Sequence, residues 1–152
     1  MISRVHRSGY TYEYRHRVTF EDTNLVGNVY YANHIKWQGR CRELFVREHA
    51  PALMDEIETG LAIVTTRCSC EYHQELRAFD EVVVAMRTGR VTPTTIVMIF
   101  DYIRVRDGNE ELVATGEQRV AFMRRAGDEL VPTPIPAVMR AALESRGVRV
   151  PG

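Results

Sequence analysis

The chain has no excess charge of either sign. Of its 152 residues, 20 are lysine or arginine and 20 are aspartate or glutamate, so the formal net charge at pH 7 is zero. Proteins that bind nucleic acids or anionic membranes neutralise phosphates with surplus basic side chains, and this chain has no such surplus. The composition therefore argues against nucleic acid as a partner.

Long apolar runs are missing as well. No apolar stretch approaches the ~18 residues that a membrane-spanning helix needs, and residues 1–10 are polar and basic, without the apolar segment of a secretory signal. We therefore expect a cytoplasmic protein that does not contact membranes. Cysteine is scarce: Cys41, Cys68 and Cys70 make an odd number, which in a reducing compartment predicts reduced, buried thiols.

Several catalytic motifs are also lacking. The sequence contains no Gly-x-Ser-x-Gly elbow, no phosphate-binding glycine loop and no HExxH pair. Cys68 and Cys70 with His73 come nearest to a metal cluster, but the two cysteines stand closer together than the common zinc motif requires. We therefore predict no metal site.

What the chain does have is a regular order of secondary structure within a length, residues 1–152, that fits a single domain. Alternation over residues 10–20 predicts a half-buried strand, and helical spacing of apolar residues predicts a long helix over about residues 31–48. A short helical connection follows over residues 52–58, and a short helix ends the chain over residues 137–144. The β-rich runs between them cover residues 61–72, 81–91, 94–106 and 111–124. We expect these four consecutive strands to form an antiparallel meander.

The run 94–106 carries apolar side chains on both faces over most of its length. A strand that is covered on both sides needs two partners, and the one long helix can cover only one face. We therefore expect a second copy of the chain to cover the other face, which gives a homo-oligomer.

The junction between the first strand and the long helix suits a polarised carbonyl. A loop over residues 21–28 leads into the helix start, whose unpaired backbone N–H groups can bind an oxyanion, and Gly27 lets a ligand approach the backbone. Arg42 falls on the flank of the apolar stripe of the helix, where it is either ion-paired or snorkelling, or a fixed positive charge at a pocket. His34 lies in the first helical turn, where a core or surface position is favoured over a place at a pocket.

Residues 20–45 resemble the signature of hotdog-fold thioesterases of the 4-hydroxybenzoyl-CoA thioesterase-like group, F-x-D-x-D-x-x-G-x-V-Y-Y-x-N-Y-x-x-W-x-x-x-x-R-x-x-F. The residues in register are Phe20, Asp22, Gly27, Val29, Tyr30, Tyr31, Asn33, Trp37, Arg42 and Phe45. The resemblance implies an α+β hotdog fold, in which a curved antiparallel sheet wraps around one long central helix. It also implies dimers that join their sheets edge to edge, that can pair into tetramers, and that hold acyl-thioester sites at the dimer interface.

One residue departs from the signature. In those thioesterases the second acidic residue of D-x-D is the catalytic carboxylate, whereas this chain has Asn24, whose amide can act neither as base nor as nucleophile. The thioesterases associated with enediyne polyketide synthases also lack this acid, and the chain resembles them most. This resemblance implies hydrolysis of a β-ketoacyl polyene thioester carried on the phosphopantetheine of an acyl carrier protein, without a further cofactor. The β-keto acid product would lose carbon dioxide to give a methyl ketone.

For this reaction we predict that the backbone N–H of Tyr31 binds the thioester carbonyl oxygen, while Asn24 and Arg42 hold and polarise the carbonyls or the attacking water. Thr65 and Thr66, on the strand after the helix, are weaker candidates to line the acyl tunnel from the partner subunit.

Two alternatives remain open. One is a general acyl-CoA thioesterase in which Asp22 or Glu43 serves as the base. The other is a non-catalytic hotdog protein that binds an acyl chain or a partner synthase without turnover.

Overall fold

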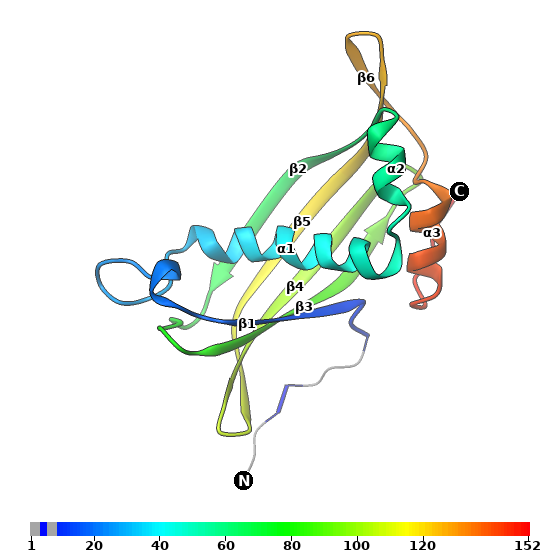
Figure 1. Cartoon of the computed structure of the whole chain (residues 1–152). Coiled ribbons are helices and arrows are strands. Elements are labelled where there is room, and N and C mark those ends of the chain that lie inside the picture. Colours follow the sequence, from blue (N-terminus) through cyan, green and yellow to red (C-terminus); the bar gives the residue numbers. More distant parts are fainter. Residues whose placement is uncertain (1–3, 6–8) are drawn as a thin grey trace.

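The structure is a computed structural model that describes residues 4–5 and 9–152. A long helix, α1, crosses one face of an antiparallel sheet, and two short helices, α2 and α3, lie together at one end of that sheet (Figure 1). Among the described residues no helix has the length and apolar character to cross a membrane. The elements are β1 (Tyr12–Arg17), a 3-10 turn (Phe20–Asp22), α1 (Ala32–His49), α2 (Leu53–Glu58), β2 (Leu61–Tyr72), β3 (Glu81–Val91), β4 (Thr95–Arg106), β5 (Asn109–Ala126), β6 (Glu129–Pro132) and α3 (Ala137–Glu144).

The strands follow the order β1-β3-β4-β5-β2, with β6 paired to β5. The predicted meander is confirmed for β3, β4 and β5, but it is wrong for β2, which pairs with β5 at the far edge of the sheet. The reason is α1, which lies between β1 and β2 in the chain. Its 18 residues extend ~27 Å and carry the chain from the β1 edge across the sheet to the opposite edge, where β2 begins.

The predicted helices and the four later strands agree with the observed elements to within two residues. The first strand was predicted too long, because residues 20–22 form a 3-10 turn and β1 ends at Arg17. β1 alternates between half-buried and exposed side chains, as its sequence pattern predicts. The strand β6 was not predicted, because all four of its side chains are exposed and it therefore shows no alternation. It folds back on β5 through a turn at Gly127, whose φ of 65° favours glycine.

The core lies between α1 and the inner face of the sheet. Trp37, Cys41 and Phe45 of α1 are buried there, at the helical spacing that the sequence shows. Of the other cysteines, Cys70 is half-buried and Cys68 is exposed, so the prediction of buried thiols is wrong for Cys68.

The outer face of the sheet is partly covered by the chain itself. A second apolar cluster contains Ile103 of β4 with two residues of β3, and Val5 and Tyr10 of the N-terminal segment pack against it. The inference that only a second copy could cover this face is therefore wrong around Ile103. Val97 and Ile99, further along the same strand, are half-buried.

Candidate active site

Asp22 fastens the loop that precedes α1. The residue is 8 % exposed, and its Oδ2 lies 2.9 Å from His16 Nε2 and accepts a hydrogen bond of 3.0 Å from the Thr19 N–H. Its backbone carbonyl accepts hydrogen bonds from the Tyr30 N–H at 2.9 Å and from Asn33 Nδ2 at 2.8 Å. Asp22 therefore ties β1 to the start of α1.

The carboxylate of Asp22 is ionised and engaged. Burial alone would raise its pKa, but the Thr19 N–H and His16 outweigh this effect and lower it. His16 has no free ring nitrogen, since its Nδ1 lies 2.8 Å from the Tyr14 hydroxyl, which also accepts a hydrogen bond from Arg40. This geometry suits a supporting role for Asp22 better than the role of a base.

Asn24 and Gly27 form an exposed turn in that loop. Asn24 Oδ1 accepts a hydrogen bond from the Val26 N–H at 3.1 Å, and its backbone carbonyl accepts one from the Gly27 N–H at 3.0 Å. Gly27 has a φ of 90°, a conformation that side chains rarely adopt, so the turn requires glycine. The loop therefore presents the Asn24 amide at the molecular surface.

Tyr31 precedes the first residue of α1. Its backbone N–H has no acceptor within the described part of the chain, as expected for a helix start, so it is available to a ligand. Its carbonyl accepts a hydrogen bond of 2.6 Å from the Tyr72 hydroxyl, which attaches the helix start to β2. Asn24, Gly27 and Tyr31 thus lie at one end of α1.

Arg42 lies eleven residues further along α1. Its Nη1 donates hydrogen bonds to Gln118 Oε1 at 2.7 Å and to Thr65 Oγ1 at 3.4 Å, and among the described residues no carboxylate lies within ion-pair distance. Burial lowers its pKa, and the nearby Glu43 opposes this effect. An ion pair therefore does not explain Arg42: a neutral amide holds the guanidinium, and its charge stays unneutralised.

A cavity of about 610 Å³ opens beside Arg42. It extends only toward the C-terminal half of α1, because no residue of α1 before Arg42 lines it. Its walls are largely apolar and come from all three helices and four strands. They are Arg42, Glu43, Phe45, Val46, Leu53, Met54, Ile57, Leu61, Ala62, Ile63, Met86, Thr88, Ile96, Met98, Val120, Phe122, Arg125, Met139 and Leu143. We call it the apolar cavity.

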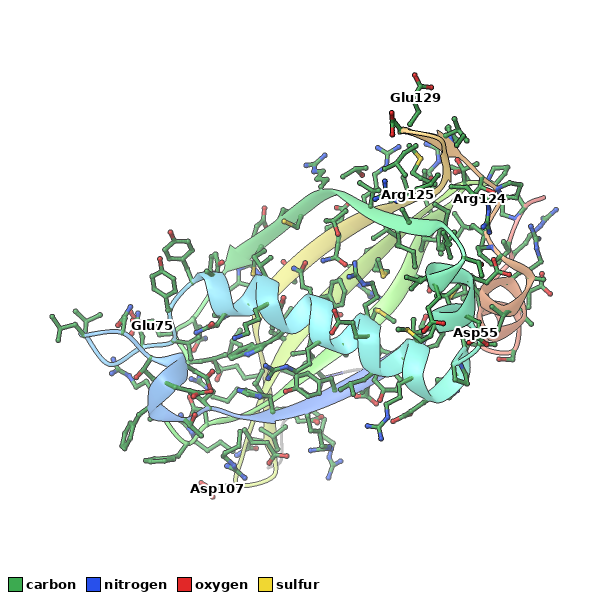
Figure 2. All side chains as sticks on the ribbon, turned by 45° about the horizontal axis from the view of Figure 1, so that its top comes forward. Asp55, Glu75, Asp107, Arg124, Arg125 and Glu129 are labelled. Carbon is green, nitrogen blue, oxygen red and sulfur yellow. The ribbon has the colours of Figure 1, made fainter. Side chains whose placement is uncertain are left out.

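A second cavity of about 280 Å³ lies at the start of α1, lined by Asn28, Val29, Tyr31, His34, Tyr72, His73, Gln74, Glu75 and Leu76. The two cavities lie at opposite ends of the molecule: Glu75 marks the second, whereas Arg125 borders the apolar cavity (Figure 2). His34 is 3 % exposed and neither of its ring nitrogens has a partner in the described structure, so burial lowers its pKa to about 4. His34 both lines this cavity and belongs to the core.

One chain does not bring the predicted site residues together. Tyr31 and Arg42 are separated by ~16 Å of helix, and Asn24 lines neither cavity. Thr65 contacts Arg42, whereas the Thr66 hydroxyl donates to the Arg119 carbonyl at a β-bulge, outside both cavities. Gln118, the partner of Arg42, was not predicted from the sequence. The pattern of β5 could have indicated it, because Gln118 stands two residues before Val120 and is therefore a polar residue on the inward face of the strand.

The profile of the thioesterase-like superfamily matches residues 18–143, which include the loop, α1, every strand after it and most of α3. The chain belongs to the thioesterase-like superfamily. No curated protein matches the chain. The dynemicin thioesterase, whose structures are described for induced-fit and allosteric effects upon polyene binding, is 50% identical, with a TM-score of 0.84 over 89% of this chain and 96% of that one.

Two further thioesterases share the fold at lower identity. A gentisyl-coenzyme A thioesterase is 22% identical, with a TM-score of 0.71 over 86% of this chain and 98% of that chain. A 1,4-dihydroxy-2-naphthoyl-CoA thioesterase from Synechocystis is 16% identical, with a TM-score of 0.78 over 91% and 98%. The predicted hotdog fold is confirmed, and this superfamily member is a thioester hydrolase.

The described part of this protein contains no group of side chains that could form a metal site. Within residues 4–5 and 9–152, no three side chains of histidine, cysteine, aspartate or glutamate gather as metal ligands would.

Proposed function

We propose that this thioesterase releases a β-ketoacyl polyene from the acyl carrier protein of an iterative enediyne-type polyketide synthase. The observation that carries the proposal is Arg42, an unneutralised cation held by Gln118 at the edge of an otherwise apolar cavity. A β-ketoacyl polyene has the matching chemistry, with two adjacent carbonyls at one end of a long hydrocarbon. The similarity to a thioesterase that binds a polyene supports the same substrate class.

The apolar cavity suits the hydrocarbon part of this substrate. Its volume of about 610 Å³ falls in the range of ~300–1,000 Å³ that is usual for small-molecule sites. Four methionines line it, Met54, Met86, Met98 and Met139, and thioether side chains adapt to irregular shapes and contact π-systems favourably. We infer that the polyene enters this cavity while the carbonyls stay beside Arg42.

The catalytic groups then come from two copies of the chain. In our proposal Asn24 and the Tyr31 N–H of one copy meet Arg42 of another, because one chain keeps them at separate places along α1. Two features support an oligomer of this kind. β2 is an edge strand whose outer edge is unpaired in the sheet, and the loop that carries Asn24 is exposed.

Catalysis would rest on electrostatics and positioning. The Tyr31 N–H would bind the carbonyl oxygen that becomes an oxyanion, and a single donor of this kind contributes ~3–4 kcal/mol to catalysis. Asn24 and Arg42 would hold the second carbonyl and the water. The water oxygen bonds to the carbonyl carbon, the carbon–sulfur bond breaks, and the proton of water passes to the leaving thiolate. The free β-keto acid then loses carbon dioxide to give a methyl ketone.

Complementation between two inactive variants tests the composite site. Asn24→Ala and Arg42→Ala should each abolish or greatly slow release from a β-ketoacyl carrier protein. Unfolding and reassembling the two variants together should restore about a quarter of wild-type activity, since half the dimers are mixed and each mixed dimer has one intact site. Mass spectrometry of the products would identify the β-keto acid and methyl ketone. No recovery from the mixture would contradict a composite site, and full activity of both variants would contradict the roles of the residues.

A second candidate function has one observation in its favour. Glu43 lines the apolar cavity next to Arg42, where it could serve as the base of a general acyl-CoA thioesterase. Under this alternative Glu43→Gln loses hydrolysis of simple acyl-CoA substrates, whereas our proposal predicts that the same variant still releases the β-ketoacyl chain.

A further inference from the structure

The end of the apolar cavity that lies farthest from the loop is bordered by two helices. On α1 the lining residues run from Arg42 to Val46, and the cavity continues from there to α2 and α3. In both views these two short helices lie side by side at the end of the sheet opposite the Asn24 loop (Figures 1 and 2). A chain whose carbonyl end stays at Arg42 must therefore point its tail toward these helices.

Two side chains of α3 reach that cavity. Met139 and Leu143 are four residues apart, which places them on one face of the helix, and both are buried and line the cavity wall. The opposite face carries exposed residues such as Ala141. The inward face of α3 is therefore a wall of the cavity as well as a part of the core.

The helix α3 is held firmly enough to serve as a wall. The Ile135 N–H donates a 2.9 Å hydrogen bond to the Pro93 carbonyl just before the helix, and Ile135 itself is buried. After the helix the Val148 N–H returns to the Leu143 carbonyl at 3.0 Å, and Arg140 donates a 2.7 Å hydrogen bond to the Val150 carbonyl. The segment before α3 is thus fixed to the turn before β4, and the chain that follows α3 folds back onto the helix.

We propose that α3, through Met139 and Leu143, sets the length of the acyl chain that this thioesterase accepts. The inference rests on the proposed function, because it takes the apolar cavity as the acyl site. A chain that fits buries its last carbons against these two side chains, and a longer one collides with them. Each additional methylene that is buried increases binding about fourfold, so the wall discriminates between neighbouring chain lengths.

Substitution of Met139 in both directions tests the wall. Met139→Ala removes three heavy atoms and makes room for about two methylenes, so activity toward chains two carbons beyond the wild-type optimum should rise about 16-fold relative to the optimum substrate. Met139→Trp should shift the optimum toward shorter chains. Val138→Ala is the matched control, since Val138 is a half-buried neighbour on the same helix that does not line the cavity.

The assay measures kcat/KM for β-ketoacyl-pantetheine thioesters with chains of about six to sixteen carbons, and each value is divided by that of the shortest substrate. This ratio cancels any loss of folded enzyme, so a partly unstable variant still reports its length profile. If the wild type is active but neither Met139 variant changes the profile, or if Val138→Ala shifts it equally, the inference about α3 is overturned.

A binding measurement separates this inference from the proposed function. Saturated fatty acids of the same lengths would compete with a fluorescent conjugated tetraene fatty acid for the cavity. If the wild type hydrolyses none of the thioesters, the proposed function fails. A length preference in binding that shifts with Met139→Ala would then still support α3 as the wall, and an unshifted preference would overturn it.

Discussion

The buried imidazole of His34 should make the protein sensitive to mild acid. His34 is 3 % exposed and burial lowers its pKa from 6.5 to about 4. Below pH 6.5 the unfolded chain therefore binds a proton at His34 that the folded chain does not bind. The contribution of the neutral imidazole to the free energy of unfolding is complete above this pH and declines as the pH falls toward 4. At about 1.4 kcal/mol per pH unit, the shift corresponds to a loss of about 3 kcal/mol.

The surroundings of His34 make this assignment specific. Its ring lies against Trp37, Tyr72 and Tyr102, with ring centroids 4.8–5.3 Å away. Burial raises the pKa of Tyr72 to about 12 and also raises that of Tyr102, so neither phenol changes charge in this range. The Tyr31 carbonyl is the polar group that partly opposes the shift.

Urea unfolding at pH 7 and pH 4.5 measures the effect. We expect the free energy of unfolding of the wild type to fall about 2 kcal/mol more over this interval than that of His34→Phe or His34→Asn, neither of which titrates. The other histidines are common to all three proteins, so their contributions cancel in the comparison. An equal fall in wild type and both variants would refute the reasoning.

Three other variants test the packing and the site. Gly116→Ala would place its Cβ 2.9 Å from the Ser69 carbonyl and should cost ~1–3 kcal/mol in urea unfolding, whereas Gly39→Ala, which meets no atom within 4 Å in α1, should gain up to ~1 kcal/mol. Asp22→Asn should lower stability at pH 7 and remove the part of the acid transition that occurs as pH falls below 3.8 through the lowered pKa of Asp22. Gln118→Leu removes the acceptor of the cavity arginine, and a hydrogen bond to a charge is worth ~1.5–3 kcal/mol, so kcat/KM should fall about 10- to 150-fold while melting stays cooperative.

The sequence predicts the elements well because their signals are local. Burial alternates along β1, turn residues bound β3 and β4, and a glycine stands in the turn after β5, so each boundary follows from residues near it. Strand order has no such signal. The chain enters β2 from α2, and only the path of α1 across the sheet decides which edge β2 joins.

The same holds for the candidate site: features that depend on neighbouring residues could be predicted from the sequence, and contacts between distant residues could not. The unpaired N–H groups at the helix start were predicted from the loop alone, and the Tyr31 N–H has no acceptor among the described residues. Gly27 was predicted as a point of close ligand approach, and its φ of 90° shows why the backbone there requires glycine. The partner of Arg42 was not predicted, because Gln118 lies 76 residues away and meets it only when β5 packs under α1. The apolar cavity could not be predicted from the sequence either, since it forms between elements from both halves of the chain.

Asn24 bears on the choice between a β-ketoacyl thioester and a simple acyl-CoA as substrate, which neither the motif nor the fold decides alone. Its Oδ1 accepts a hydrogen bond from the Val26 N–H and so helps to shape the turn, while its Nδ2 has no acceptor among the described residues and can donate to a ligand. A carboxylate here could take a proton from water, whereas the N–H groups of an amide can only donate hydrogen bonds, to a carbonyl oxygen or to water, and take up no proton. In the composite site that we propose, such a donor would act together with the unneutralised Arg42, and the pair would favour substrates that bring two carbonyls of their own. This argues for a β-ketoacyl thioester over a simple acyl-CoA, and Asn24→Asp should accordingly lower the preference for the β-keto substrate while raising hydrolysis of simple thioesters.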